Sequence, residues 1–266
     1  MSIITISRGS YSRGKEVAEK LAQILGYECI SREVLLEASE QFNIPEIKLV
    51  RAIHDAPSIL ESFGSNKKKY IAFFQSALLK RIQRDNKVYH GLAGHFFLAG
   101  VSHVLKVRII ADLEDRVKLE MEREKISSKD ALKLLKKDDE ERRKWSLSLY
   151  GLDTNDPSLY DLVINVSHLT VADAADIIAH TAGFDRFRAT EQSKRAMDDL
   201  VMASEIRAKL INWHPSVQVT VKNGEVEVRI ERLHEDEAEI RNNVVRLTSN
   251  LPGVKRVKIN VSRLDR

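Results

Sequence analysis

Cysteine is almost absent from this sequence of 266 residues, which contains only Cys29. One cysteine excludes an internal disulfide and a cysteine-based zinc cluster, and it is typical of proteins in a reducing compartment. No apolar run approaches the roughly 20 residues that a membrane-spanning helix needs, and the run at residues 3–6 is too short for the core of a signal peptide. We therefore expect a cytoplasmic protein without a transmembrane segment.

The sequence also lacks a strong excess of one charge. It holds 43 basic and 39 acidic residues, which gives a formal net charge of +4. Nucleic-acid binding needs basic residues gathered on one face, so we expect no nucleic-acid partner. Hydrophobic residues make up 43% and charged residues 31%, a composition that supplies a core and excludes wholesale disorder.

Short β-branched runs alternate with longer helical periodicities up to about residue 185. This alternation predicts βαβ units, and hence an α/β fold with a parallel sheet covered by helices on both faces. The expected strands are residues 3–7, 88–90, 104–110 and 162–166. The expected helices are residues 15–25, 70–84, 113–124, 129–149 and 171–180.

A different pattern, α-β-β-α-β, follows residue 194. Two β-branched alternating runs flank Asn223-Gly224, whose preference for positive φ angles predicts a tight β-hairpin. We therefore expect two domains, residues 1–185 and 194–266, the second being a small α+β domain. Its expected elements are helices at residues 197–211 and 235–249 and strands at residues 217–221, 226–230 and 254–261.

A glycine-rich loop follows the first predicted strand and opens the first predicted helix. It matches the pattern G-x-x-x-x-G-K. In such a loop, backbone N–H groups converge on phosphate oxygens, the helix N-terminus adds positive potential, and the lysine reaches the β- and γ-phosphates. The alternative is a strand-to-helix turn with a solvated lysine. The sequence predicts a nucleotide-phosphate site formed by Gly9, Ser10, Tyr11, Ser12, Arg13, Gly14, Lys15 and Glu16.

Glu16 stands where the pattern has a serine or threonine that ligates Mg²⁺. A carboxylate beside a triphosphate repels it unless the side chain turns away, binds the metal or pairs with a basic residue. The sequence leaves these three alternatives open. Glu16 and Asp112, which ends a predicted strand at the sheet edge where ligands gather, are the candidate metal ligands. N-capping of the next helix is the alternative for Asp112.

The sequence contains a series of short segments in a characteristic order: residues 4–10, 14–22, 25–27, 31–35, 111–117, 139–142 and 160–167. Together they resemble the cytidylate-kinase-like family of P-loop nucleoside monophosphate kinases. The resemblance covers about residues 1–182 and implies a P-loop kinase fold, a three-layer parallel sheet with a helical lid. A Gly-Lys-Glu run is itself familiar in that family, so Glu16 is compatible with membership.

The resemblance implies transfer of the γ-phosphoryl group of ATP, with Mg²⁺, to a nucleoside monophosphate, with CMP or dCMP favoured. Such chemistry needs positioning, charge neutralisation and exclusion of water. The candidate catalytic residues are Lys15 and three arginines of the lid, Arg116, Arg123 and Arg142. Arg143 is adjacent to Arg142, so the two cannot face the same way. The alternative for each arginine is a solvated helix face.

Arg32, His90 and Asp139 are the candidate substrate-binding residues. Arg32 resembles the family arginine near the monophosphate site, and Asp139 belongs to an Asp-x-x-Arg spacing that resembles the lid of the family. The family usually carries Gly-Arg-Gly after the second predicted strand, whereas this chain has Leu92 in place of the arginine. His90 or His95, partly protonated near neutrality, would be weak substitutes. Polar residues at a strand end are the alternative for both histidines.

The C-terminal segment resembles a BON domain in its hairpin at residues 217–228 and its ending at residues 251–259. Such domains are non-catalytic, and the resemblance implies contact with a protein, a lipid surface or a small ligand. Lys255, Arg256 and Lys258 form a small basic patch that suits an anionic partner, although a solvated strand edge is the alternative.

Two functions stay open. The first is an ATP-dependent nucleoside monophosphate kinase whose C-terminal module serves regulation or docking. The second is a catalytically weak or inactive nucleotide sensor or scaffold, which uses the same pocket without turnover. Nucleotides are the expected ligands in both cases, and both are compatible with a homo-oligomer.

Overall fold

The computed structural model describes residues 2–10, 12–31, 33–46, 48–49, 60–91, 94–232, 236–248 and 251–263. The chain divides into two compact units. The first comprises Met1–Val34, Ile53–Ser62 and Arg84–Thr190, and the second comprises Leu35–Ala52, Phe63–Gln83 and Glu191–Arg266. The second unit thus takes two segments from the N-terminal part of the chain. The boundaries of independently folding domains at residues 185 and 194 stay a prediction.

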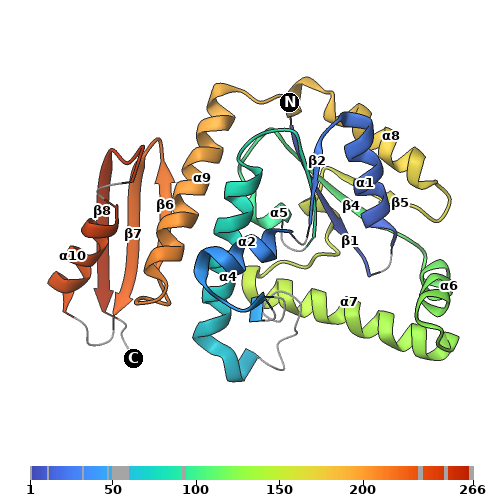
Figure 1. The fold of residues 1–266 in the computed structure, drawn as a ribbon, viewed down its shortest axis with the longest axis horizontal. Coiled ribbons are helices and arrows are strands. Elements are labelled where there is room, and N and C mark those ends of the chain that lie inside the picture. Colours follow the sequence, from blue (N-terminus) through green and yellow to red (C-terminus); the bar gives the residue numbers. More distant parts are fainter. Residues whose placement is uncertain are drawn as a thin grey trace. The chain divides into compact units, whose positions relative to one another are not determined.

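A five-stranded sheet forms the centre of the first unit (Figure 1). The strands lie in the order β2-β3-β1-β4-β5, and every neighbouring pair is parallel. This arrangement confirms the predicted α/β class and brings the carboxyl ends of all five strands to one edge. The strands are β1 (Ile3–Arg8), β2 (Glu28–Ile30), β3 (Lys87–His90), β4 (Val104–Ile110) and β5 (Leu162–Asn165).

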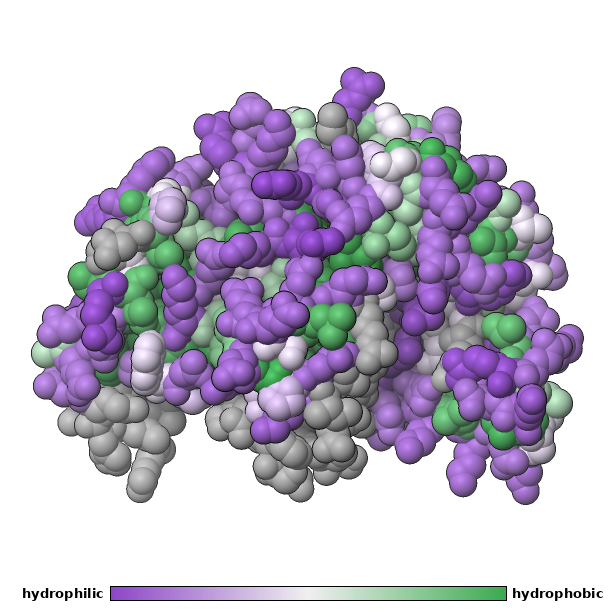
Figure 2. Space-filling model, in the orientation of Figure 1, coloured by the Kyte–Doolittle hydropathy of each residue, from purple (hydrophilic) through white to green (hydrophobic). Residues whose placement is uncertain are grey.

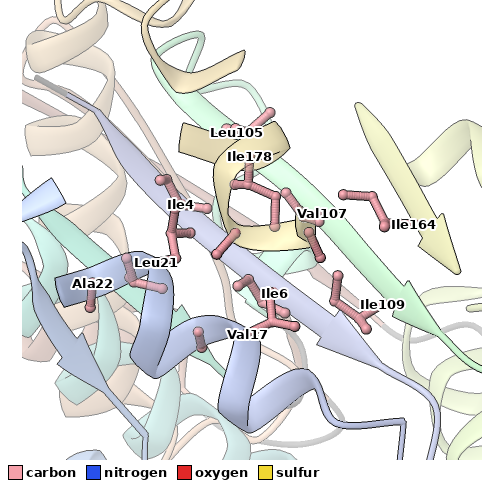
Figure 3. Close-up of a cluster of buried hydrophobic side chains, with 14 of the residues drawn as sticks. Ile4, Ile6, Val17, Leu21, Ala22, Leu105, Val107, Ile109, Ile164 and Ile178 are labelled. Carbon is pink, nitrogen blue, oxygen red and sulfur yellow. The ribbon is translucent and has the colours of Figure 1, made fainter. Parts of the chain in front are cut away.

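Two helices cover one face of this sheet, α1 (Gly14–Leu25) and α8 (Val171–Ala182). Figure 3 shows Ile4 and Ile6 of β1 directed toward Val17 and Leu21 of α1. All four side chains are fully buried, and burial of each contributes roughly 1.5–3 kcal/mol. This packing fixes the first turn of α1 beside the end of β1, where the glycine-rich loop lies.

Three further helices of the first unit are α5 (Gly94–Phe97), α6 (Leu113–Glu124) and α7 (Ser128–Tyr150). A short turn joins α6 to α7. Lys125 in this turn has a φ of 54°, and the side chain of Ser127 accepts a hydrogen bond from the Asp130 N–H at the start of α7. Val117, Ala131 and Leu135 form a small core between the two helices. This pair of helices is the segment in which the sequence predicts a lid.

A three-stranded mixed sheet in the order β6-β7-β8 belongs to the second unit. β6 and β7 form an antiparallel hairpin, and β8 runs parallel to β7. Asn223 and Gly224 have φ angles of 53° and 79°, as predicted for the turn. The order confirms the predicted αββαβ arrangement: α9 (Glu191–Leu210), β6 (Gln218–Lys222), β7 (Glu225–Arg232), α10 (Glu237–Thr248) and β8 (Arg256–Arg263).

Helices α2 (Glu33–Phe42) and α4 (Leu60–Ile82) also contribute to the second unit. The rings of Phe42 and Phe73 stack with their centroids 4.2 Å apart. Phe73 is 2% exposed and shares a hydrophobic core with Val226 and Val228 of β7. The C-terminal sheet and the long helix α4 are therefore stabilised by the same core.

Hydrophilic residues dominate the face shown in Figure 2, and the hydrophobic residues on it form small separate patches. Across the described ranges, none of the helices combines the length and the apolar character that a membrane crossing requires.

Candidate phosphate-binding site

The glycine-rich loop connects the end of β1 to the start of α1. Arg13 is the N-cap of α1 and has a φ of 56°, and the first helical hydrogen bond runs from the Val17 N–H to the Arg13 carbonyl at 3.1 Å. The N–H groups of Gly14, Lys15 and Glu16 come before this bond, so the helix itself offers them no acceptor. Together with the helix dipole, these amides suit an anion.

Buried hydrogen bonds hold the loop to strand β4. The Gly9 N–H donates to the Ile109 carbonyl at 3.2 Å. The Ser12 hydroxyl is fully buried and lies 3.0 Å from the Gly9 carbonyl and 3.1 Å from the Ile109 carbonyl. Ser12 therefore braces the loop through its side chain, which leaves its backbone for a ligand.

The two glycines of the loop differ in the space that is available for a side chain. A Cβ atom at Gly14 would lie 2.8 Å from the Cβ atom of Arg8, so a larger residue there forces the loop away from β1. At Gly9 the nearest atom would be the Ser12 hydroxyl oxygen at 3.8 Å, which is ordinary van der Waals contact. Close approach of helix and strand thus requires glycine at position 14 only.

Glu16 pairs with Arg13. The Arg13 guanidinium donates to both carboxylate oxygens, at 3.1 and 3.2 Å through Nε and at 2.7 Å through an NH2 group. Of the three alternatives that the sequence leaves open for Glu16, the structure has the pairing with a basic residue. The pairing offsets the repulsion between Glu16 and an incoming phosphate, and whether Glu16 also binds a metal stays a prediction.

Lys15 lies along the surface of α1. Its ammonium group is 3.6 Å from a carboxylate oxygen of Glu19, one helical turn further on, and its side chain is 62% exposed. Exposed pairs of this kind contribute about 0–1 kcal/mol, so little free energy is needed to turn the ammonium toward a ligand at the loop.

An arginine and an aspartate from the two lid helices meet the loop at Ser10. Arg116 of α6 donates through Nε to the Ser10 carbonyl at 2.7 Å and through NH2 to Asp139 of α7 at 2.6 Å. The other oxygen of Asp139 accepts a hydrogen bond from the Ser10 N–H at 3.2 Å. A carboxylate oxygen therefore accepts a hydrogen bond from one amide of the predicted phosphate loop, the interaction that a phosphate oxygen would make in the predicted site.

The other predicted lid arginines have different surroundings. Arg142 donates to the carbonyl of Arg8, at the end of β1, at 3.2 Å. The neighbouring Arg143 turns instead to Asp153, at 2.7 Å. Arg123 pairs with Glu120 on its own helix at 2.9 Å. The structure thus brings Arg116 and Arg142 to the loop and its preceding strand, and it places Arg143 elsewhere.

Asp112 lies at the carboxyl end of β4 and is the N-cap residue of α6, but its side chain makes no capping hydrogen bond. One carboxylate oxygen accepts a hydrogen bond from the side-chain amide of Asn165 at 2.8 Å. The N–H of Asp112 donates to the Ser167 hydroxyl at 2.7 Å. Asp112 therefore occupies the N-cap position of α6, as the alternative stated, but its carboxylate does not cap the helix.

Burial lowers the pKa of both histidines near β3. His90 is 5% exposed, and burial, with the charge of Arg8, lowers its pKa to about 4. Burial and the charge of Arg108 lower the pKa of His95 to about 3. The lowered pKa values favour the alternative of polar residues at a strand end, and the substrate-binding role of His90 stays a prediction. Two other predicted site residues, Tyr11 and Arg32, lie outside the described residues, as does Leu92.

Sequence reasoning missed a buried polar network beside the end of β1. The Arg108 side chain of β4 lies among Ser7, Asn155 and Tyr160, with hydrogen bonds to all three. An arginine within the apolar run of residues 104–110 was the available signal.

The fold is of the class found in P-loop kinases. A parallel sheet in the order 2-3-1-4-5 carries the loop at the end of its central strand, and residues of α6 and α7 contact that loop. The sequence model of the Cytidylate kinase-like family matches residues 3–168, so the chain belongs to that family.

Relatives agree with this membership, and a solved structure has a similar fold. The cytidylate kinase of Sulfolobus acidocaldarius is 30% identical over 176 residues, which cover 66% of this chain and 91% of that protein. The cytidylate kinase of Pyrobaculum aerophilum is 28% identical over 178 residues, which cover 66% of this chain and 90% of that protein. An uncharacterized protein from Eubacterium ventriosum has a similar fold, with a TM-score of 0.53 at 23% identity, covering 68% of this chain and 98% of that one.

Proposed function

We propose that the protein transfers the γ-phosphoryl group of ATP to a nucleoside monophosphate, with CMP or dCMP as the favoured acceptor. The observation that carries this proposal is the anion-binding geometry of the loop, where the Ser10 N–H already holds a carboxylate and Arg116 lies against the same residue. Membership of the Cytidylate kinase-like family, and two relatives named cytidylate kinase, support this acceptor class.

The chain supplies positioning and charge in this proposal. The amides of Gly14 and Lys15 bind phosphate oxygens at the helix N-terminus, and the Lys15 ammonium swings from Glu19 to the β- and γ-phosphates. Arg116 and Arg142 neutralise the charge that develops during transfer, and the lid excludes water. Arg123 and the substrate-binding roles of Arg32, His90 and Asp139 stay predictions.

Magnesium would offset the negative charge of the nucleotide phosphates. Among the described residues, no group of three or more histidine, cysteine or acidic side chains is arranged to hold a metal ion by itself. The donors that fit are single carboxylates, Asp112 at the end of β4 and Glu16 on α1. Phosphate oxygens and water would therefore provide most of the ligands, as is usual for Mg²⁺.

Phosphoryl transfer is tested by ADP production with CMP, dCMP, UMP and AMP as separate acceptors. We expect one of the pyrimidine nucleotides to stimulate turnover, and Lys15→Ala to reduce kcat/KM by roughly 10²–10³-fold. Lys20→Ala is the matched control, because Lys20 is an exposed lysine of the same helix. If no acceptor stimulates ADP production while the protein still binds ATP, the proposed kinase activity is rejected.

That outcome would favour the second candidate, a nucleotide sensor or scaffold. One observation points to it: Glu16 stands where the phosphate-loop pattern has a metal-ligating serine or threonine. In this case ATP or ADP raises the melting temperature, whereas ADP production does not depend on a monophosphate.

We also propose that residues 194–266 form a BON-like module for regulation or docking. The αββαβ order and the exposed cations Lys255, Arg256 and Lys258 support it. Flotation with vesicles containing anionic lipid, compared with neutral vesicles, tests a lipid partner. Binding that survives exchange of all three cations for glutamine would reject the basic patch as the contact. The cytoplasmic location and a homo-oligomeric state stay predictions.

A further inference from the structure

A buried arginine lies at the strand ends that carry the loop. Arg108 is 9% exposed. Its guanidinium donates to Asn155 Oδ1 at 2.9 Å, to the Tyr160 hydroxyl at 3.3 Å and to the Ser7 hydroxyl at 3.5 Å. The centre of the guanidinium is also 5.6 Å from the centroid of the Tyr160 ring. All of these partners are neutral, so they satisfy the donors of Arg108 without balancing its charge.

The carboxylate that acts on Arg108 is not in contact with it. Asp153 is close enough for Arg108 to contribute to lowering its pKa, after the larger effects of the Asn155 N–H and of Arg143. Asp153 is bound to Arg143 at 2.7 Å, and Arg143 also lies 3.8 Å from Glu140. The nearby Lys106 is paired with Asp161 at 3.5 Å, so it leaves the balance around Arg108 unchanged.

Burial of a charge without a carboxylate in contact is costly, so the place of Arg108 in the sheet is informative. Arg108 is the register partner of Ser7 on β1, two residues before Gly9. The next residue on β4, Ile109, accepts hydrogen bonds from Gly9 and Ser12 of the loop. The buried charge of Arg108 therefore lies at the base of the phosphate loop.

We propose that Arg108 is a positioning residue that attracts the nucleotide polyphosphate through its buried charge, without touching it. The inference rests on the proposed function, because it requires a nucleotide at the loop. It goes beyond that function because it assigns part of the affinity for phosphate to the Arg108 guanidinium, which lies on β4 and outside the loop. The turn after β3 has no arginine between His90 and Phe96, so this charge is not duplicated there.

A charge that acts at a distance has a signature that a structural brace lacks. Its contribution grows with the charge of the ligand, in the order AMP, ADP, ATP, and falls with added salt. A brace that only holds Ser7, Asn155 and Tyr160 in place would change the binding of the three nucleotides by similar factors.

The first experiment measures Kd for ATP, ADP and AMP by calorimetry at two salt concentrations. We expect Arg108→Met to weaken ATP binding roughly tenfold, or about 1.4 kcal/mol, with a smaller loss for ADP and the smallest for AMP. Arg108→Lys, which keeps the charge, should stay within about threefold of the wild type. Equal losses for the three ligands, or a lysine variant as weak as the methionine variant, would overturn the proposal.

A second variant tests the charge while keeping the arginine. Asn155→Asp places a carboxylate 2.9 Å from the guanidinium with little change in shape. It should raise the melting temperature, because the buried charge gains a partner, and weaken ATP more than AMP. If the affinity for ATP is unchanged while stability rises, Arg108 is only a brace. Tyr160→Phe removes a neutral hydrogen bond and should show no grading with ligand charge. Failure of the wild type to bind any nucleotide would instead reject the proposed function.

Discussion

Replacement of Asp139 by asparagine should tighten the binding of ATP. In the structure the Asp139 carboxylate accepts a hydrogen bond from the Ser10 N–H at 3.2 Å and binds Arg116 at 2.6 Å. Both groups are proposed to bind phosphate, so the nucleotide has to displace the carboxylate first. Asparagine removes the negative charge and leaves an amide oxygen, which is a weaker acceptor for Arg116.

The size of the effect follows from the exposure of the pair. Hydrogen bonds to charged groups contribute about 1.5–3 kcal/mol, but pairs in contact with solvent contribute about 0–1 kcal/mol. The Asp139 side chain is 39% exposed and that of Arg116 is 11% exposed, so we take about 1 kcal/mol. This free energy corresponds to roughly a fivefold lower Kd for ATP.

Calorimetric titration with ATP and Mg²⁺ measures this change. Glu140→Gln is the control, because Glu140 is an exposed acid on the same helix and its exchange alters the net charge equally. An Asp139→Asn variant that binds ATP no more tightly than the control would refute the displacement argument. Weaker binding would mean that Asp139 orients Arg116 for the nucleotide. A raised KM for the monophosphate alone would support the predicted contact of Asp139 with the acceptor.

Three further outcomes are expected. Gly14→Ala should lower the free energy of unfolding by about 1–3 kcal/mol, because its Cβ would lie 2.8 Å from that of Arg8. Gly9→Ala should lower it by less. Equal losses of the two variants in urea titrations would contradict the steric argument. Phe73→Ala should cost about 3–5 kcal/mol, since the ring is 2% exposed in the core of the second unit, and a loss below 1 kcal/mol would contradict this. The pKa of His90 is lowered to about 4 in the folded protein, whereas in the unfolded chain it has the ordinary histidine value of about 6.5. Between these two pH values the unfolded chain binds a proton that the folded protein does not, so the free energy of unfolding should fall as the pH is lowered from about 6.5 to about 4. His90→Gln should flatten that fall by up to about 1.4 kcal/mol per pH unit, and an unchanged slope in acid denaturation would show that His90 is not the titrating group.

Local signals in the sequence were sufficient for much of the fold. The loop at Gly9–Lys15 is recognisable because strand, glycines, lysine and helix follow one another directly. The hairpin is recognisable because Asn223-Gly224 suits a turn with positive φ angles, and both residues have them. The short strand β2 (Glu28–Ile30) was not predicted, since three residues carry no readable period and their pairing with β3 is a tertiary contact. The helix α2 was not predicted either.

The site depended more on contacts between distant residues. Asp139 reaches Ser10 across 129 positions of the chain, and no local pattern encodes that meeting. The pairing of Arg13 with Glu16, by contrast, is a contact three residues apart that the sequence left open among alternatives. The sequence shows Arg108 as a charged residue in an apolar strand. Its role was missed because the neutral partners of its guanidinium are brought together only in the folded chain.

The loop at the start of α1 is proposed to bind the polyphosphate of a nucleotide. Amide resonances of the isotopically labelled protein, recorded while ATP with Mg²⁺ is added, test this binding residue by residue. We predict saturable shifts for the N–H groups of Ser10, Gly14, Lys15 and Glu16, and their loss in Lys15→Ala at the same ATP concentration. Shifts confined to other parts of the chain, or none at millimolar ATP, would contradict the claim.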